Sequence, residues 1–139
     1  MSAAQSTGRL HGQLALVTGA SAGIGRATAL ALAREGAGIV ATGRRQAELD
    51  GLAQECAALG VPVQVLAGDL NDAAFAQQLA AAAAGVDIFI NNAGVLTYAP
   101  LLELTQQQVD DMFQTNVLAS IRIASWWRPT WSGEARGTS

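Results

Sequence analysis

The sequence has no lysine, a single cysteine and little charge. All eight basic residues are arginine, so any site that requires a lysine side chain is absent from this chain. The lone thiol, Cys56, excludes an internal disulfide, and its alanine-rich helical surroundings indicate a small buried or half-buried side chain. With a net charge of −3 and scattered arginines, the chain lacks the positive surface that binds nucleic acid or an anionic membrane.

Long apolar runs are absent as well. The N-terminus has no hydrophobic core of the kind that a signal peptide needs, and charged or amide residues interrupt the later apolar stretches. We therefore expect a cytoplasmic protein without a membrane partner. What is present is a chain of 139 residues that is 50% hydrophobic and 14% charged, which is typical of one globular domain.

Short apolar runs alternate with helical patterns along the chain. The runs that predict buried parallel strands are 14–18, 39–42, 63–67 and 86–90. The patterns that predict helices between them are 25–34, 46–59 and 71–84, the last with Asn71 or Asp72 as its cap. Such alternation gives parallel strands with right-handed crossovers, so we expect an α/β fold, a doubly wound sheet with helices on both faces.

A last long helix is expected from about Gln106 into the 120s, with Thr105 as its N-cap. Its apolar residues recur three or four positions apart, which predicts that they form one buried stripe. The residues of this expected stripe are Val109, Met112, Phe113 and Val117.

A glycine-rich loop follows the first strand and opens the first helix. It reads TGASAGIG, Thr18 to Gly25. A strand that turns into a helix through glycines exposes backbone N–H groups and the positive end of the helix dipole to a pyrophosphate. Gly19 would permit the tight turn, Gly23 the approach of the phosphate, and Gly25 close packing of the helix on the strand. A turn made for packing alone is the alternative, but this strand-loop-helix context predicts a dinucleotide site.

The end of the second strand indicates which dinucleotide binds. About 20 residues beyond the loop, an acidic side chain would hold the ribose 2′-hydroxyl of NAD. Here the sequence reads TGRRQ, with Gly43 in the place of the acid and Arg44 and Arg45 after it. A guanidinium can pair with a 2′-phosphate, which favours NADP over NAD. The alternative is a pair of solvated surface charges.

Four motifs together resemble the short-chain dehydrogenase/reductase family. They are Gly-x-x-x-Gly-x-Gly in TGASAGIG, the GDL of residues 68–70, the NNAG of residues 91–94, and Asn116-Val117. The resemblance runs from about Leu10 to Ile123. It implies a Rossmann fold in which the four strands stand in the order 3-2-1-4.

The resemblance also implies an activity and a set of site residues. Such proteins are NADP(H)-dependent oxidoreductases, with NAD as the alternative cofactor, and transfer hydride between the cofactor and an alcohol or carbonyl substrate. Asp69 is expected to contact the adenine, and Asn116 to belong to a catalytic tetrad. The residues expected at the cofactor are Gly19, Ser21, Gly23, Ile24, Gly25, Arg44, Asp69, Leu70, Asn91, Ala93 and Gly94. A small-molecule substrate and a homo-oligomer are expected of full-length relatives.

One part of the family pattern is missing from this chain. The carbonyl oxygen needs a proton donor, which in the family is the tyrosine of a Tyr-x-x-x-Lys pair. This sequence has no lysine and no tyrosine after Tyr98, so we expect no catalysis by the chain alone. Two other classes stay open: a noncatalytic NADP-binding module, and a partner-docking protein that uses Trp126, Trp127 and Trp131 as anchors.

Residues 1–125 are therefore expected to form a truncated NAD(P)-binding domain, and residues 126–139 an aberrant tail. All three tryptophans lie in that tail. Read from the third base of the Trp126 codon, the codons permit VAPDMVGRGPGHI, which looks like the family's continuation. Only some of these codons are forced. The hypothesis is a one-base insertion or deletion near Ser125, and resequencing that stretch of the gene tests it.

Overall fold

The computed structural model describes residues 8–94 and 103–125. The chain divides into two compact units, residues 1–93 and residues 94–139. The tryptophans of the tail and Tyr98, on which part of the sequence interpretation depends, lie outside the described residues.

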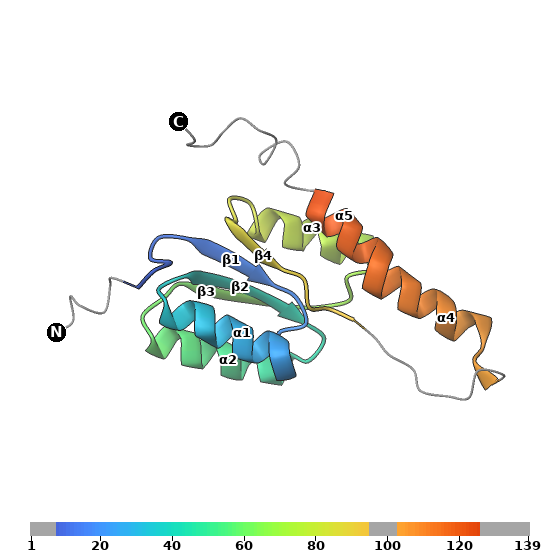
Figure 1. Ribbon diagram of the computed structural model, residues 1–139, viewed down its shortest axis with the longest axis horizontal. Coiled ribbons are helices and arrows are strands. Elements are labelled where there is room, and N and C mark those ends of the chain that lie inside the picture. The colour runs from blue at the N-terminus through green and yellow to red at the C-terminus, as the bar shows by residue number, and fades with distance from the viewer. Residues whose placement is uncertain (1–7, 95–102, 126–139) are drawn as a thin grey trace. The chain divides into compact units, whose positions relative to one another are not determined.

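The N-terminal unit is built on a parallel sheet of four strands in the order β3-β2-β1-β4 (Figure 1). The strands are β1 (Leu14–Val17), β2 (Gly38–Gly43), β3 (Val63–Ala67) and β4 (Ile88–Ile90). In the register of the central pairs, Leu16 lies beside Val40 of β2 and Phe89 of β4. The predicted fold class and strand order are confirmed.

Three helices connect these strands and lie on both faces of the sheet (Figure 1). They are α1 (Gly23–Arg34), α2 (Gln46–Ala58) and α3 (Ala73–Ala82). Gly36 and Gly60 follow the ends of α1 and α2 with φ of +97° and +85°, a left-handed conformation that glycine adopts without strain. Of the two predicted caps of α3, Asp72 is the one used, because its side chain accepts a hydrogen bond from the Ala74 N–H.

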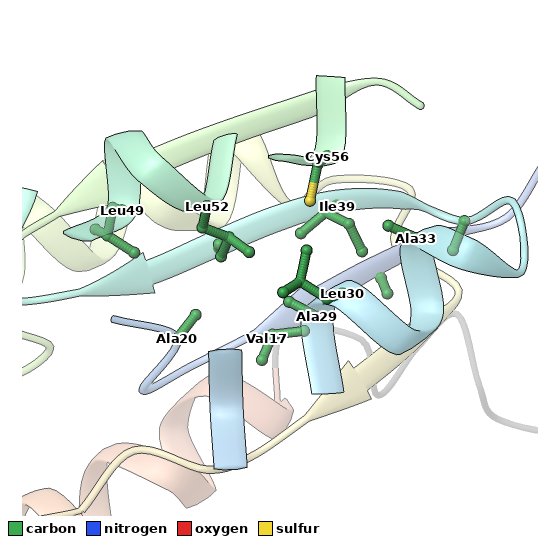
Figure 2. Packing of buried hydrophobic residues seen from close by; sticks show 12 residues of the cluster. Val17, Ala20, Ala29, Leu30, Ala33, Ile39, Leu49, Leu52 and Cys56 are labelled. Atoms are coloured by element: carbon green, nitrogen blue, oxygen red, sulfur yellow. The ribbon is translucent and has the colours of Figure 1, made fainter. Parts of the chain in front are cut away.

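The core between the sheet and helices α1 and α2 is tightly closed (Figure 2). Ile39, Leu49, Leu52 and Cys56 are fully buried in it. Alanine at Ala29 and other α1 positions keeps that helix close to the sheet. Burial raises the pKa of the Cys56 thiol, and the prediction of a buried cysteine is confirmed.

The described part of the C-terminal unit is helical. It comprises α4 (Gln106–Phe113), the π-helix η3 (Gln114–Leu118) and α5 (Ala119–Ser125). The N-cap prediction is confirmed as a capping box: Gln108 N donates to Thr105 Oγ1 at 3.1 Å, and Thr105 N donates to Gln108 Oε1 at 2.9 Å. No described helix, here or in the N-terminal unit, is long and apolar enough to cross a membrane.

The predicted buried stripe of this helical segment is wrong. Phe113 is 60% exposed and Val117 is 41% exposed, while Val109 and Met112 are half-buried and α4 has no buried residue. The π-turn that starts after Phe113 takes more residues per turn than an α-helix, so it rotates Val117 away from the face that the earlier residues define. The sequence pattern had assumed one uninterrupted α-helical period.

Candidate functional site

The glycine-rich loop is held against β4 by close backbone contact. Gly19 has φ of +63°, and a Cβ there would lie 2.6 Å from the Asn92 carbonyl oxygen. A Cβ at Gly25 would overlap the Gly19 carbonyl oxygen and lie 2.6 Å from Asn92 Nδ2. Glycine at both positions is therefore required by the turn and by the close packing of α1, as the sequence predicted.

Gly23 differs from these two glycines, because a Cβ there would meet no protein atom within 4 Å. Its φ is +60°, so the backbone conformation and not protein packing favours glycine. Helix α1 begins here, and its N-cap Ala22 provides no side-chain cap. The first N–H groups of α1 therefore receive no side-chain cap from Ala22 and lie at the positive end of the helix dipole, where an anion can bind. Ile24, in the same turn, is 77% exposed.

Two side chains that the sequence interpretation did not place at the site fix the loop in position. The Thr18 hydroxyl accepts hydrogen bonds from Asn92 N and Ala93 N, both at 2.9 Å, and lies 3.4 Å from the Ile90 carbonyl oxygen, to which it donates. Asn92 Nδ2 donates to the Gly19 carbonyl oxygen at 3.3 Å. Thr18 lies in the TGASAGIG motif and Asn92 in the NNAG motif. Their places in these motifs were the signal in the sequence that could have identified them as site residues.

The other side of the loop rests on the end of β2. Ala20 N donates to the Thr42 carbonyl oxygen at 3.0 Å. The next residue, Ser21, is only 8% exposed, and its Oγ has no hydrogen-bond partner among the described residues. A buried hydroxyl without a partner carries an energetic cost. This hydroxyl packs against Gly43 at the end of β2.

Arg44 and Asp69 meet at the ends of neighbouring strands. Arg44 Nη2 lies 3.4 Å from Asp69 Oδ1, and the two side chains are 60% and 51% exposed. Asp69 Oδ1 also accepts a hydrogen bond from Asn71 N at 2.9 Å. An ion pair this exposed contributes about 0–1 kcal/mol, so a ligand phosphate could draw Arg44 away at little cost. The sequence placed both residues at the site but did not predict their pairing.

The remaining predicted site residues are spread over two units. Leu70 is buried, so a cofactor could reach only its backbone. Asn91 is exposed and Ala93 half-buried at the end of β4. In the C-terminal unit, Asn116 lies in η3, and a Cβ at Gly94 would be 3.1 Å from Asn116 Oδ1. The catalytic role of Asn116 stays a prediction.

Metal ligation has no support in the described part of the chain. No group of three or more His, Cys, Asp or Glu side chains gathers there in a way that could hold a metal ion. The chemistry that the described site does offer is the binding of an anionic group by backbone N–H donors and a guanidinium.

Comparisons with known proteins agree with this geometry. A family model described as short chain dehydrogenase matches residues 13–138. L-xylulose reductase of Mesocricetus auratus is 42% identical over 115 residues, which are 83% of this chain and 46% of that protein. D-erythrulose reductase of Gallus gallus is 36% identical over 114 residues, 82% of this chain and 45% of that protein. The chain thus spans about half the length of the curated relatives it matches.

Solved structures show the same likeness. A variant of a Serratia marcescens short-chain dehydrogenase/reductase has a TM-score of 0.80 and 33% identity, covering 86% of this chain and 51% of that one. A 3-oxoacyl (acyl-carrier-protein) reductase from Agrobacterium tumefaciens C58, solved with NADP bound, has a TM-score of 0.78 and 33% identity, covering 86% of this chain and 48% of that one. The glycine loop, the strand order and these matches together establish that the chain belongs to the short-chain dehydrogenase family of oxidoreductases.

Proposed function

We propose that this chain provides the NADP(H)-binding part of a short-chain oxidoreductase and binds NADP(H) at the carboxyl ends of β1, β2 and β3. The observation that carries the proposal is the glycine loop itself. Its open Gly23 and uncapped α1 N-terminus lie beside the buried, unpartnered hydroxyl of Ser21. The open Gly23 and the uncapped helix N-terminus fit a pyrophosphate that approaches the backbone.

Typical free energies of interaction favour the binding of an anion at this loop over a turn made only for packing. An anion at a helix N-terminus gains about 0.3–1 kcal/mol when exposed and about 2 kcal/mol when partly buried. A hydrogen bond to a charged group contributes about 1.5–3 kcal/mol. Packing explains Gly19 and Gly25, whose absent side chains would strike protein atoms, whereas Gly23 is favoured by its positive φ and leaves open space into which a phosphate can approach.

The preference for NADP over NAD rests on the end of β2. Arg44 follows Gly43 there, and no carboxylate occupies position 43 to accept a hydrogen bond from a 2′-hydroxyl. The guanidinium of Arg44 is exposed and weakly held by Asp69, so it is available for the 2′-phosphate. The Agrobacterium relative solved with NADP bound is consistent with this choice.

Bound NADP(H) would supply hydride to a carbonyl group. This chain contributes the residues that bind and orient the cofactor, and Asn116 is the catalytic residue we propose for it. The Tyr-x-x-x-Lys pair is absent from the sequence, so the chain alone is expected to bind the cofactor without turnover. The relatives named for L-xylulose and D-erythrulose favour a small hydroxyketone as the substrate of a complete protein.

Calorimetric titration of the 139-residue chain with NADPH tests the proposal. Gly23→Ala adds a methyl group where the phosphate should pass and should weaken binding at least tenfold, about 1.4 kcal/mol. Gly85→Ala is the matched control, since Gly85 also has a positive φ, of +83°, and a Cβ there also meets open space, and it should bind as the parent does. A cooperatively melting parent chain that binds no NADPH would contradict the proposal, as would oxidation of NADPH by this chain with dihydroxyacetone.

A further inference from the structure

A pocket lies at the opposite edge of the sheet from the glycine-rich loop, where strands β1, β2 and β3 begin. Its volume is about 600 Å³, and its walls come from residues within 11–14, 33–38 and 59–62. The second and third of these segments follow α1 and α2, which lie side by side on one face of the sheet (Figure 1). Small-molecule sites have volumes of about 300–1,000 Å³, so this amino-edge pocket is large enough for a ligand.

Backbone hydrogen bonds fix the walls of the amino-edge pocket. Gly38 N donates to the Gln13 carbonyl oxygen at 2.8 Å, and the next N–H of β2 donates to the Pro62 carbonyl oxygen at 2.9 Å. A Cβ at Gly36 would lie 3.0 Å from His11 Cα, so the segment before β1 also packs closely on the end of α1. The pocket is therefore preformed, and a ligand binds it without first ordering the chain.

Apolar side chains make up part of the pocket wall. Among them are Leu14, Leu59, Val61 and Pro62. Leu59 is 44% exposed, and Pro62 is exposed as well. A ligand that covers these side chains removes apolar surface from water, which favours binding. The pocket therefore suits a ligand with a sizeable apolar part.

Bare backbone makes up another part of the wall, because four glycines line the pocket. Three of them have a positive φ, which favours glycine. The fourth, Gly38, has no positive φ, and a Cβ there would lie 3.2 Å from Leu14 Cδ1 and 3.5 Å from Pro62 Cγ. A methyl group at this position would thus occupy space between Leu14 and Pro62. Glycine leaves that space open, and a flat ring can approach the bare backbone closely.

The charged groups of the pocket favour an anion. Arg34 and His11 both line it, and no acidic side chain is among its described lining residues. Arg34 forms no ion pair with another described residue, while the neighbouring Glu35 is paired with Arg9 at 3.3 Å. A guanidinium binds a carboxylate through two parallel N–H donors and stacks on aromatic rings. An imidazole N–H is a further donor.

A cation is the alternative ligand, because the C-terminal end of a helix carries a partial negative charge. Both α1 and α2 end at this pocket. In α1 the Leu32 and Ala33 carbonyl oxygens already accept hydrogen bonds from the cap residue, and in α2 the Cys56 and Ala57 oxygens do so. The guanidinium of Arg34 places a full positive charge at the same wall, so the pocket favours an anion over a cation.

We propose that the amino-edge pocket binds an aromatic carboxylate. The ring lies against the glycine backbone between Leu14 and Pro62, and the carboxylate accepts hydrogen bonds from Arg34 and His11. This site is separate from the proposed NADP(H) site, and its occupation does not depend on the cofactor.

Calorimetric titration of the full chain with 2-naphthoate tests the charge requirement. The parent should bind 2-naphthoate about tenfold more tightly than the neutral 2-naphthamide or the cationic 2-naphthylmethylamine. Arg34→Gln should weaken naphthoate binding about tenfold, and Arg45→Gln should leave it within about twofold. Arg45 is the matched control because it precedes α2, whose 13 residues span about 20 Å and end at the pocket. No binding of naphthoate, tighter binding of the amine, or equal losses in the two variants would overturn the inference.

Gly38→Ala tests the shape of the pocket separately from its charge. The added methyl group should weaken naphthoate binding about tenfold while the chain still melts cooperatively, because only the flexible end of Leu14 has to move. Gly51→Ala is the control, since Gly51 lies in α2 outside the pocket wall and a Cβ there meets open space. If the folded Gly38→Ala variant binds naphthoate as the parent does, the ring does not lie between Leu14 and Pro62.

Proton NMR locates the bound ligand without any variant. His11 is the only histidine of the chain, so its ring signals are identified directly, and they should shift as 2-naphthoate saturates the protein. Prior addition of NADPH should change the naphthoate affinity by less than about twofold, because the glycine-rich loop lies at the other edge of the sheet. An unmoved His11 signal, or displacement of the naphthoate by NADPH, would overturn the inference whatever the variants show.

Discussion

The two units of this chain bury their large apolar side chains to different extents, although each has exceptions: Ile123 of the C-terminal unit is buried and Ile24 of the N-terminal unit is exposed. In the N-terminal unit, Leu16, Ile39 and Leu52 are fully buried. In the described helices of the C-terminal unit, Phe113 and Ile121 are 60% and 62% exposed. Burial of such residues is the main favourable term in folding, so the described N-terminal unit carries its own core. The glycine-rich loop is built on that core.

The difference in burial between the two units is tested most strongly by removing one large side chain from each. Leu52→Ala creates a cavity in the α2 core and should cost about 2–5 kcal/mol of unfolding free energy. Phe113→Ala removes a ring that is mostly exposed and should change stability by no more than about 0.5 kcal/mol. Urea unfolding followed by circular dichroism measures both. Equal losses would show that Phe113 contributes to a core as Leu52 does.

The link between the core and the glycine loop can be tested at Thr18. Thr18→Val keeps the shape but deprives Asn92 N and Ala93 N of their acceptor, which should cost about 1–3 kcal/mol and weaken NADPH binding. Thr28→Val is the control, because the half-buried Thr28 donates its hydroxyl to the Ile24 carbonyl oxygen within its own helix at 2.7 Å. If both variants lose stability equally, the Thr18 hydrogen bonds do not hold the loop.

The reaction rate of the Cys56 thiol measures how readily the N-terminal core opens. Burial raises the pKa of its thiol, so at a given pH the folded protein has less of the reactive thiolate than an exposed cysteine has. Reaction with a disulfide reagent at pH 8 should be much slower than for a free thiol and should become fast once urea unfolds the chain. Rapid reaction without urea would mean that this core opens readily.

The smallest effect on stability is expected at Glu35, on the surface of the N-terminal unit. Hydrogen bonds from Arg9 N and Nε, together with the Arg9 charge, lower the pKa of Glu35. A lowered carboxyl pKa stabilises the fold above the unfolded-state pKa, and that stability is lost as the pH falls through the folded-state pKa. Glu35→Gln should therefore lower the melting temperature slightly at pH 7 and not at pH 3. A larger difference at acid pH would reverse the assigned sign.

Much of the N-terminal fold can be predicted from the sequence, because each element is specified by residues that are close together in the chain. Residues 63–67 were predicted as a strand and form β3 with the same bounds. Short apolar runs mark buried parallel strands, and glycines such as Gly36 and Gly60 end helices in a left-handed conformation. The Thr105 cap also depends only on residues within one turn.

The parts that the sequence did not predict depend on contacts between distant segments or on a local change of helical period. The overlap between Ser21 and position 43 arises only when the loop after β1 rests on β2. The Arg44–Asp69 ion pair joins the ends of two strands in the same way. The π-helix at Gln114–Leu118 changes the direction in which Val117 faces. No residue in that stretch predicts a π-helix.

We propose that the described loops select NADP(H) over NAD(H). The most direct test is a parallel calorimetric titration of the full chain with NADPH and NADH, repeated on Arg44→Ala. We expect NADPH to bind at least tenfold more tightly than NADH, and Arg44→Ala to remove most of this difference by weakening NADPH binding alone. Equal affinities in the parent chain, or a preference that survives in Arg44→Ala, would contradict it.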